Sequence, residues 1–305
     1  MNHNIRKILK ENNLHLKQIG YKKNSKIVDT QEGKYILKTK KKDKEELYNY
    51  LQNRNFNNYL PLKNKYTDYY EMYPFIENKS TQEKDKAIDL IYTISMLHIK
   101  TTTYEDKNID EIKEIYEQTQ NEINDIKSYY LNIQDYIETK VYMSPAEYLL
   151  MRNISQIYAA LNFSTRMLDL WYEEIKEKKS VRKTLLHNNL SLDHFFNEDN
   201  FYLVDWDNSK KGYVIYDFLN FYKNEYVNLE MNALFQLYQS KYKYTKDEKL
   251  LFLSLIAIPN KVKLNKTNYI NTLEVRKLVT YLGKTNYFIS KEYKKDQKTD
   301  KEELK

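Results

Sequence analysis

The residues of this sequence whose types and spacing could support chemistry lie between positions 185 and 218. A short apolar run is followed by His187 and by a polar loop that contains Asn189 and His194. A second apolar run ends at Asp205, and Asp217 follows close to a glycine. A carboxylate at the end of a strand can hold a divalent cation, and a polar loop beside it can orient a reacting group. The spacing is typical of a catalytic loop and a metal-binding aspartate at the ends of short strands.

This stretch resembles the core of the aminoglycoside phosphotransferase (choline kinase-like) family, a branch of the protein-kinase-like fold, and in particular the CotS-type spore coat proteins. The family pattern is His-Gly-Asp-Leu, three variable residues, Asn, and then a hydrophobic strand that ends in Asp-Trp or Asp-Phe. By this resemblance, His187 is the histidine that holds the loop, and Asn189 stands at the catalytic aspartate. His194 stands at a metal-binding asparagine, Asp205 at the Mg²⁺-binding aspartate, and Asp217 at a later aspartate that braces the loop.

The candidate catalytic residues are therefore Asn189 and His187, and the candidate metal ligands are Asp205 and His194. Two of these positions depart from the family pattern. Asn189 cannot take a proton as a carboxylate can, although its amide oxygen can accept a hydrogen bond from a hydroxyl group. Loss of a general base commonly lowers a rate by about 10²–10⁴-fold. His194 is a poor ligand for Mg²⁺ and suits softer ions such as Mn²⁺ or Zn²⁺ better.

The N-terminal part predicts a short amphipathic helix over 1–12 and then three short strands, followed by a helix over Asp43–Arg54. The strands are expected at Leu14–Ile19, Lys26–Asp29 and Tyr35–Lys38. The resemblance implies that Lys38 binds the α- and β-phosphates of a nucleotide and pairs with Glu46 on the helix. The alternatives are a solvated Lys38 in a basic run and a surface Glu46.

An extended apolar run, Tyr69–Glu77, follows this helix and is interrupted by a proline. The resemblance implies that this run is the strand and hinge between two lobes, whose backbone binds adenine. Glu71 and Tyr73 are the candidate nucleotide-binding residues of the hinge. Aromatic residues in such a run are equally compatible with core packing.

The rest of the chain is predicted to be mostly helical. Apolar residues recur at helical spacing in six segments: 86–99, 108–139, 144–179, 225–241, 246–258 and 268–290. The second long helix begins at Ser144-Pro145-Ala146-Glu147, a capping box with proline at the first helical position. The predicted fold class is α+β: an N-lobe at 1–73 with a small antiparallel sheet and one helix, then a helical C-lobe at 74–290. The C-lobe carries the catalytic loop at 187–194, and a charged tail without stable structure is expected at 291–305.

Composition restricts the class of protein further. The 305 residues are 41% hydrophobic, which is sufficient for a globular core, and the net charge of +7 is spread along the chain. The absence of cysteine excludes disulfides and thiolate sites and fits a cytoplasmic location. No apolar run is long enough to span a bilayer, and the N-terminus lacks the apolar segment of a signal peptide.

These observations leave three hypotheses. The first is a phosphotransferase that uses ATP with Mg²⁺, or Mn²⁺ in its place, and transfers the γ-phosphate to a hydroxyl group of an unknown acceptor. The second is a catalytically impaired pseudokinase that acts as a nucleotide-binding scaffold or a spore-coat-type structural protein. In either case the helices within 108–179 could dock a partner protein. The third, a nucleic-acid-binding protein, is disfavoured because the sequence lacks a recognition-helix signature or an aromatic and basic motif.

Overall fold

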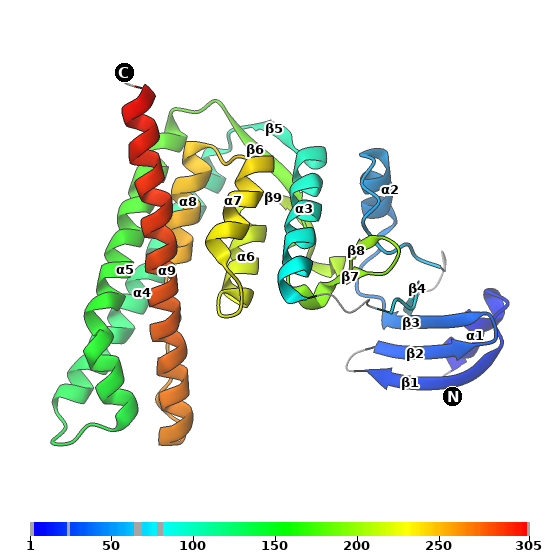
Figure 1. Cartoon of the computed structure of the whole chain (residues 1–305), viewed down its shortest axis with the longest axis horizontal. Coiled ribbons are helices and arrows are strands. Elements are labelled where there is room, and N and C mark those ends of the chain that lie inside the picture. Colours follow the sequence, from blue (N-terminus) through cyan, green and yellow to red (C-terminus); the bar gives the residue numbers. More distant parts are fainter. Residues whose placement is uncertain (1–2, 23–24, 64–68, 78–81, 304–305) are drawn as a thin grey trace. The chain divides into compact units, whose positions relative to one another are not determined.

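The computed structural model describes residues 3–22, 25–63, 69–77 and 82–303. Its internal contacts divide the chain into two compact units, drawn in Figure 1. The first unit consists of Met1–Thr101 and His187–Lys210, and the second of Thr102–Leu186 and Lys211–Lys305. This division differs from the predicted lobes at 1–73 and 74–290, because the compact first unit also includes residues 74–101 and the loop around Asp205.

The first unit is built on a four-stranded antiparallel sheet with the strand order β1-β2-β3-β4. The strands are β1 (Leu16–Lys22), β2 (Ser25–Thr30), β3 (Gly33–Thr39) and β4 (Tyr70–Pro74). Gly33 has a φ of 139° in the tight turn from β2 to β3, a conformation that residues with a Cβ rarely adopt. In the sheet Lys38 lies opposite Glu71, so the register places these two candidate residues on neighbouring strands.

The helix α1 (His3–Glu11) covers part of this sheet through its apolar face. Ile5, Ile8 and Leu9 are buried, as their helical spacing predicts. They belong to one hydrophobic cluster with residues of three strands: Val28, Leu37 and Met72. Burial of this cluster fixes β3, the strand that carries Lys38.

The other elements of the first unit position the polar loop. They are α2 (Glu45–Asn53), α3 (Glu83–Thr101), the hairpin of β7 (Phe195–Asn197) and β8 (Phe201–Leu203), and the 3₁₀ turns η1 (Leu192–His194) and η2 (Trp206–Asn208). The helix α3 contacts both η1 and β7, and Phe195 of the hairpin is fully buried. The loop from His187 to Asp205 is therefore supported by a packed helix and by its own hairpin.

Within its described residues, 102–186 and 211–303, the second unit contains a three-stranded sheet and six helices. Its sheet has the order β5-β6-β9, formed by β5 (Thr103–Asp106), β6 (Ser180–Leu186) and β9 (Lys210–Gly212). A Cβ at Gly212 would lie 2.9 Å from Cδ1 of Leu186, so a larger residue there would require this leucine side chain to move. The strand β6 leads directly into His187.

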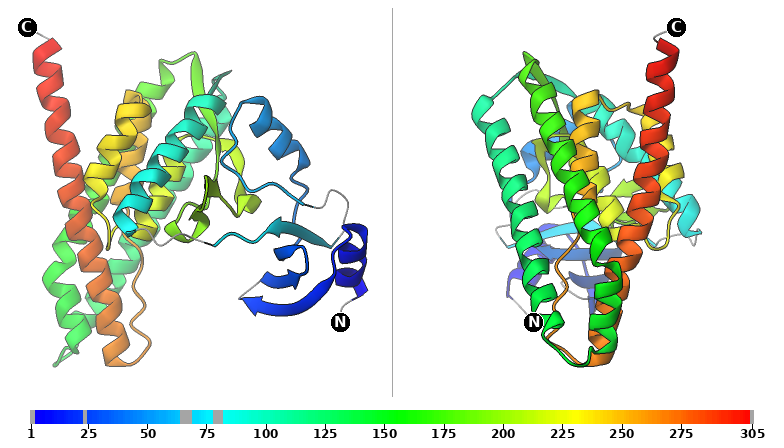
Figure 2. Two further views of the ribbon diagram at one scale, coloured as in Figure 1. Left: turned by 45° about the vertical axis from the view of Figure 1, so that its right-hand side comes forward. Right: turned by 90° about the vertical axis from the view of Figure 1, so that its left-hand side faces the viewer.

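The helices of the second unit form a bundle. They are α4 (Ile109–Glu138), α5 (Pro145–Lys176), α6 (Ile215–Glu225), α7 (Met231–Lys241), α8 (Lys246–Ala257) and α9 (Asn268–Glu303). The helix α5 runs beside α4, α8 and α9 and contacts all three (Figures 1 and 2). Ser164 of α5 and Ser254 of α8 are both buried, and the hydroxyl group of each donates to the backbone oxygen of the other at 2.9 Å. Small residues at this crossing allow the two backbones to approach closely.

The α+β class predicted from the sequence is confirmed, with two differences in the helices. The helix α6 is not predicted by the sequence pattern, because its clustered aromatic and branched residues read equally well as an extended apolar run. The structure also continues α9 through Glu303, where the sequence predicted a tail without stable structure from 291 onward. This segment lacks glycine and proline and is rich in Lys and Glu, which favour helix. Residues 304–305 lie outside the described residues.

Within the part of the chain that the structure describes, no helix combines the length and the apolar character that crossing a membrane requires.

The predicted capping box at the start of α5 is present. The backbone N–H of Ser144 donates to Oε2 of Glu147 at 2.7 Å, and Nζ of Lys140 lies 2.5 Å from Oε1. Partial burial raises the pKa of Glu147, but the hydrogen bonds from Lys140 and Ser144 outweigh it and hold that pKa below its usual value. A carboxyl group with a lowered pKa stabilises the folded state at neutral pH, and this contribution is lost as the pH falls through the lowered pKa.

We therefore expect Glu147→Gln to unfold at a lower urea concentration than the wild type at pH 7. The difference should shrink as the pH falls below about 4.3, the ordinary pKa of glutamate. The matched control is Glu177→Gln, which changes an exposed glutamate at the other end of the same helix and should cause no loss of stability. A Glu147→Gln difference that stays constant from pH 7 to pH 3 would contradict this assignment.

Candidate functional site

His187 follows β6 and is completely buried. Its Nε2 lies 2.9 Å from the backbone oxygen of Val204, and because a carbonyl oxygen only accepts, the ring donates this hydrogen bond. The ring also contacts Trp206 edge-on, with 4.7 Å between ring centroids. These contacts join the start of the polar loop to the residues on either side of Asp205, and a loop-holding role for His187 stays a prediction.

Asp205 has a left-handed backbone conformation, with φ 69° and ψ 51°. This conformation is uncommon for a residue with a Cβ and persists where the surrounding structure enforces it. The neighbouring Trp206 is 2% exposed, and its indole N–H donates to the backbone oxygen of Leu203 at 2.9 Å. Trp206 also packs edge-on against the buried Phe56. The buried indole thus anchors the turn that directs the Asp205 carboxylate toward the polar loop.

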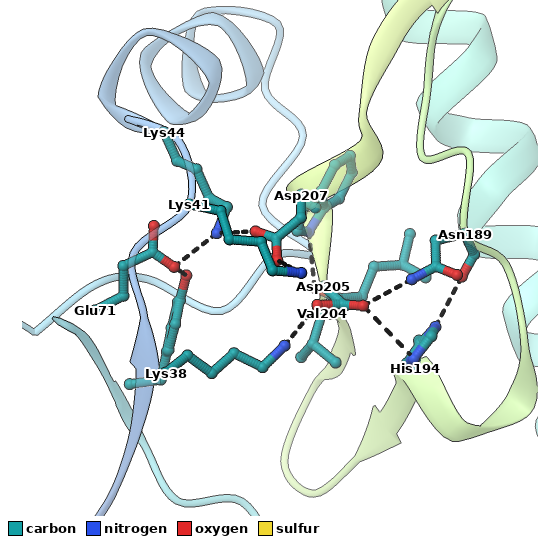
Figure 3. A network of polar contacts seen from close by, with 12 residues as sticks. Lys38, Lys41, Lys44, Glu71, Asn189, His194, Val204, Asp205 and Asp207 are labelled. Atoms are coloured by element: carbon teal, nitrogen blue, oxygen red, sulfur yellow. Dashed lines mark hydrogen bonds and ion pairs between the residues drawn. The ribbon is translucent and has the colours of Figure 1, made fainter. Parts of the chain in front are cut away.

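Both oxygens of the Asp205 carboxylate have polar partners (Figure 3). Nζ of Lys38 lies 2.6 Å from Oδ1, and Nδ2 of Asn189 lies 2.7 Å from Oδ2. Nε2 of His194 lies 3.7 Å from Oδ2. Partial burial raises the pKa of Asp205, but the hydrogen bond and positive charge of Lys38 outweigh it and keep that pKa below its usual range. Asp205 is therefore ionised at neutral pH and forms the centre of the site.

Asn189 interacts with both candidate metal ligands. Its side-chain nitrogen donates to Asp205, since an ionised carboxylate can only accept. Its backbone oxygen lies 2.8 Å from Nδ1 of His194. The structure thus brings together four of the predicted site residues, Lys38, Asn189, His194 and Asp205, although Lys38 and Asp205 are 167 positions apart in the sequence.

The predicted pairing of Lys38 with Glu46 is wrong. Glu46 is exposed in the first turn of α2, and the ion-pair partner of Lys38 is Asp205. The facing argument for Glu46 rested on the apolar side of α2, of which Leu51 is the fully buried member. Glu46 instead occupies the exposed side of the helix, as the alternative interpretation of Glu46 as a surface residue predicts.

The buried ion pairs of this region are formed by a lysine that precedes α2, and not by a glutamate on that helix. Lys44 is 4% exposed, and its Nζ lies 2.6 Å from Oε2 of Glu71 and 2.5 Å from Oδ1 of Asp207. Burial lowers the pKa of Lys44, but its hydrogen bonds to Asp207 and Glu71 outweigh this and raise that pKa above its usual value. The more exposed Lys41 also pairs with Asp207 at 3.3 Å.

Glu71 and Tyr73, the candidate hinge residues, are part of this network. Both side chains are buried, and the Tyr73 hydroxyl donates to Oε2 of Glu71 at 2.8 Å. Burial, reinforced by the neighbouring Tyr48 and Glu71, raises the pKa of Tyr73 far above its usual value, so its hydroxyl stays protonated. Their side chains therefore support the site from β4, and a role of the β4 backbone in adenine binding stays a prediction.

Sequence reasoning missed Lys44, Lys41 and Asp207. The lysines lie in the basic run that follows Lys38, and side chains in such runs are usually solvated. One signal was available: Asp207 follows Asp205 after a single residue, and two carboxylates so close together need nearby cations. Partial burial raises the pKa of Asp207, but Lys44 and then Lys41 outweigh it and lower that pKa. The site therefore combines three ammonium groups with the carboxylates of Glu71, Asp205 and Asp207.

Among the described residues, no group of three or more His, Asp or Glu side chains is arranged to hold a metal ion. The chain offers Asp205 and His194 as a pair, because Lys44 and Lys41 occupy Asp207. Mg²⁺ usually takes one or two carboxylates from a protein and completes its octahedral shell with phosphate and water oxygens. The residues thus fit a divalent ion only together with a phosphate-bearing ligand, and the imidazole is unusual for Mg²⁺.

Comparisons with known proteins establish the class of fold. The structure of aminoglycoside phosphotransferase from Alicyclobacillus acidocaldarius matches with a TM-score of 0.69 and 10% identity, covering 92% of each chain. Spectinomycin phosphotransferase APH(9)-Ia in its AMP-bound complex matches with a TM-score of 0.57 and 14% identity, over 92% of this chain and 97% of that chain. Its complex with ADP and spectinomycin matches with a TM-score of 0.53, again at 14% identity, over 93% and 97% of the two chains.

The chain therefore has the kinase-like fold of the aminoglycoside phosphotransferases, as the resemblance around Asp205 implied. No protein-family model matches the sequence, and no curated protein is significantly similar to it. Since the identities are 14% or lower, these likenesses establish the fold alone.

We predict that Lys44→Met lowers the free energy of unfolding by about 3–5 kcal/mol, since it leaves Glu71 buried without its cation and Asp207 with only the more exposed Lys41. Urea denaturation measures this change. The matched control is Lys42→Met, which alters an exposed lysine two positions away and should change the stability by less than about 0.5 kcal/mol. Equal stability of the two variants would show that Lys44 is not the counterion of these carboxylates.

Proposed function

We propose that this protein is an ATP-binding, kinase-like phosphotransferase that transfers the γ-phosphate to a hydroxyl group of an acceptor. The observation that carries the proposal is the pairing of Lys38 with Asp205 at 2.6 Å, next to Asn189 and His194. Phosphoryl transfer requires a cation on the phosphates and a carboxylate that holds a divalent ion, and these two groups lie in contact here. The fold, whose structural neighbours include complexes with AMP and ADP, supports the same assignment.

In this proposal each residue has a separate task. The ammonium group of Lys38, 31% exposed at its side chain, is accessible to a phosphate and can move from Asp205 to it. Asp205 and His194 hold the divalent ion, Mg²⁺ or Mn²⁺, which supplies neutralisation of charge on the phosphates. The buried side chains of Lys44, Glu71 and Asp207 keep the Asp205 turn in place and do not contact the nucleotide.

Asn189 determines how efficient the transfer can be. Its amide nitrogen is bound to Asp205, which leaves the amide oxygen as the acceptor for a substrate hydroxyl group. An amide orients a hydroxyl group but does not remove its proton. We therefore expect turnover about 10²–10⁴-fold below that of an enzyme with a carboxylate at this position.

The same residue favours a second candidate, a pseudokinase that binds nucleotide and acts as a scaffold or a spore-coat-type structural protein. This candidate also accommodates the exposed apolar residues between α4 and α5, where Val141 and Tyr142 are each 88% exposed. An apolar tip of this kind suits a protein partner. The two candidates share the nucleotide site and differ in whether phosphate is transferred.

The test of the shared site is thermal melting with ATP, with and without Mg²⁺ or Mn²⁺, for the wild type and Asp205→Asn. Ligand at 100 times its dissociation constant should stabilise the wild type by about 2.7 kcal/mol, and the metal-dependent part should vanish in the variant. Asp193→Asn, which changes an exposed aspartate of the same loop, is the matched control and should keep the full shift. An absence of any shift with nucleotide and metal contradicts the proposed function.

A separate measurement distinguishes the two candidates. ADP release is followed with ATP and a panel of hydroxyl acceptors that includes aminoglycosides, choline and sugars. Release that depends on one acceptor and is lost in Asp205→Asn supports the phosphotransferase. Nucleotide binding without acceptor-dependent release, in a protein that melts normally, supports the scaffold.

A further inference from the structure

Exposed apolar side chains of the second unit gather where the loop between α4 and α5 lies beside the start of α9 (Figures 1 and 2). We call residues 136–148 and 269–273 the exposed tip. These segments make up less than a tenth of the chain. They carry eight of the 20 large hydrophobic side chains that are exposed among the described residues. This concentration indicates a binding surface, since exposed hydrophobic residues are usually scattered singly.

The loop that carries the most exposed residues is held at both ends. Val141 and Tyr142 are each 88% exposed. Just before them, Nζ of Lys140 lies 2.5 Å from Oε1 of Glu147, and just after them the capping box of Ser144 begins α5. Because the fold already orders this loop, its apolar side chains can enter another apolar phase with little further loss of conformational entropy.

The aromatic residues of the exposed tip are of one kind. Tyr136, Tyr142, Tyr148 and Tyr269 are each more than half exposed. Tyrosine combines an apolar ring with a polar hydroxyl group, so it favours the boundary between lipid and water. An exposed apolar surface of this kind suits either a protein partner or a membrane, and the surrounding charges distinguish the two.

The charges around the exposed tip favour a membrane with anionic lipids. Residues 136–152 and 263–277 contain six Lys or Arg side chains and three Glu side chains. Glu147 and Glu274 pair with lysines of these same segments, which leaves Glu138 as the remaining carboxylate. Lysine is depleted at protein–protein interfaces, whereas Lys and Arg beside exposed apolar residues are typical of surfaces that bind anionic lipids. Four of the cations form no ion pair among the described residues: Arg152, Lys263, Lys266 and Arg276.

A small groove in this region combines an apolar surface with a cation. Its volume is about 220 Å³, and Pro145 and Leu273 supply apolar parts of its lining. The guanidinium group of Arg276 belongs to the same lining and can bind a phosphate through two parallel hydrogen bonds. The groove therefore offers contacts for both the phosphate and the apolar part of a lipid. The other lining residues are Asn268, Tyr269 and Thr272.

We propose that the exposed tip binds the surface of a membrane that contains anionic lipids. Val141 and Tyr142 enter the headgroup region, and the cations around the tip contact lipid phosphates. This mode of binding uses one end of a folded helix bundle and requires no membrane-spanning helix. The occupant of the tip is thus a lipid surface, and not the protein partner that the scaffold candidate would place there. The inference does not depend on the nucleotide site.

The test is sedimentation of the full-length protein, without nucleotide, with vesicles of phosphatidylcholine alone or mixed with phosphatidylglycerol. We expect at least tenfold tighter binding to the anionic vesicles, and a decrease of that binding as the salt concentration rises. Val141→Ser/Tyr142→Ser should lower the affinity at least tenfold, since it removes the apolar side chains that enter the lipid. The matched control is Tyr104→Ser/Ile109→Ser, which alters two exposed apolar residues near the other end of α4 and should bind as the wild type does.

A second pair of variants tests the charges. Arg152→Gln/Arg276→Gln removes two cations beside the exposed tip and should lower the affinity for anionic vesicles at least tenfold, with little effect on neutral ones. Its control, Arg166→Gln/Lys179→Gln, removes the same charge from exposed positions in the C-terminal half of α5 and just beyond it, and should bind as the wild type does. Circular dichroism melting confirms that each variant is folded.

The outcomes separate this inference from the proposed function. Absence of vesicle binding by the wild type overturns the membrane proposal and leaves the tip to a protein partner. Equal binding to neutral and anionic vesicles, or unchanged binding by Val141→Ser/Tyr142→Ser, also overturns it. Failure of ATP to stabilise the protein overturns the proposed function, but it does not affect vesicle binding that is measured without nucleotide.

Discussion

The structure of the site depends on the carboxylate of Asp205, which is partly buried and must be matched by cations and hydrogen-bond donors. Lys38 supplies the charge at 2.6 Å and Asn189 supplies a donor at 2.7 Å. These partners come from a strand of the sheet and from the polar loop, so one carboxylate joins two distant parts of the sequence. The left-handed backbone at Asp205 directs it there, and the buried indole of Trp206 holds that conformation.

A second, more deeply buried set of charges supports this arrangement. Lys44, Glu71 and Asp207 are each less than a tenth exposed at their side chains, and the lysine bridges the two carboxylates. Removal of Lys44 would leave Glu71 without its cation and away from water, and an uncompensated buried charge strongly destabilises a folded protein. The two aspartates therefore have different roles. The carboxylate of Asp205 contacts Lys38 and Asn189, whereas that of Asp207 anchors the turn, through Lys44, to β4 and to the start of α2.

Features of this fold that depend on residues close together in the sequence could be predicted from the sequence. The apolar face of α1 and the capping box of α5 follow from residue spacing, and the His187–Asp205 stretch indicated the class of fold. The partner of Lys38 could not be derived in this way, because it depends on how a loop 167 positions away is folded. The choice of Glu46 failed for the same reason: helix periodicity defines a face but does not determine which charged residue that face meets.

From the sequence alone, Asn189 and His194 indicate the loss of a catalytic base and of an oxygen ligand for Mg²⁺. The structure adds that the two residues are in contact with each other. The sequence identified an amide where a base was expected and an imidazole where an amide was expected. It could not reveal that Asn189 hydrogen-bonds both His194 and Asp205, because that requires the loop conformation set by η1 and by the buried hairpin. In the folded chain the two substitutions are coupled through contacts.

The central claim is that Lys38 and Asp205 form a nucleotide site. The most direct test is isothermal titration calorimetry with a non-hydrolysable ATP analogue and a divalent ion, on the wild type, Lys38→Met and the control Lys40→Met. Lys40 is a neighbouring lysine that pairs with the exposed Asp43. We predict that Lys38→Met weakens binding at least tenfold while Lys40→Met binds as the wild type does. Equal affinity of all three proteins, or no binding by the wild type, would contradict the account.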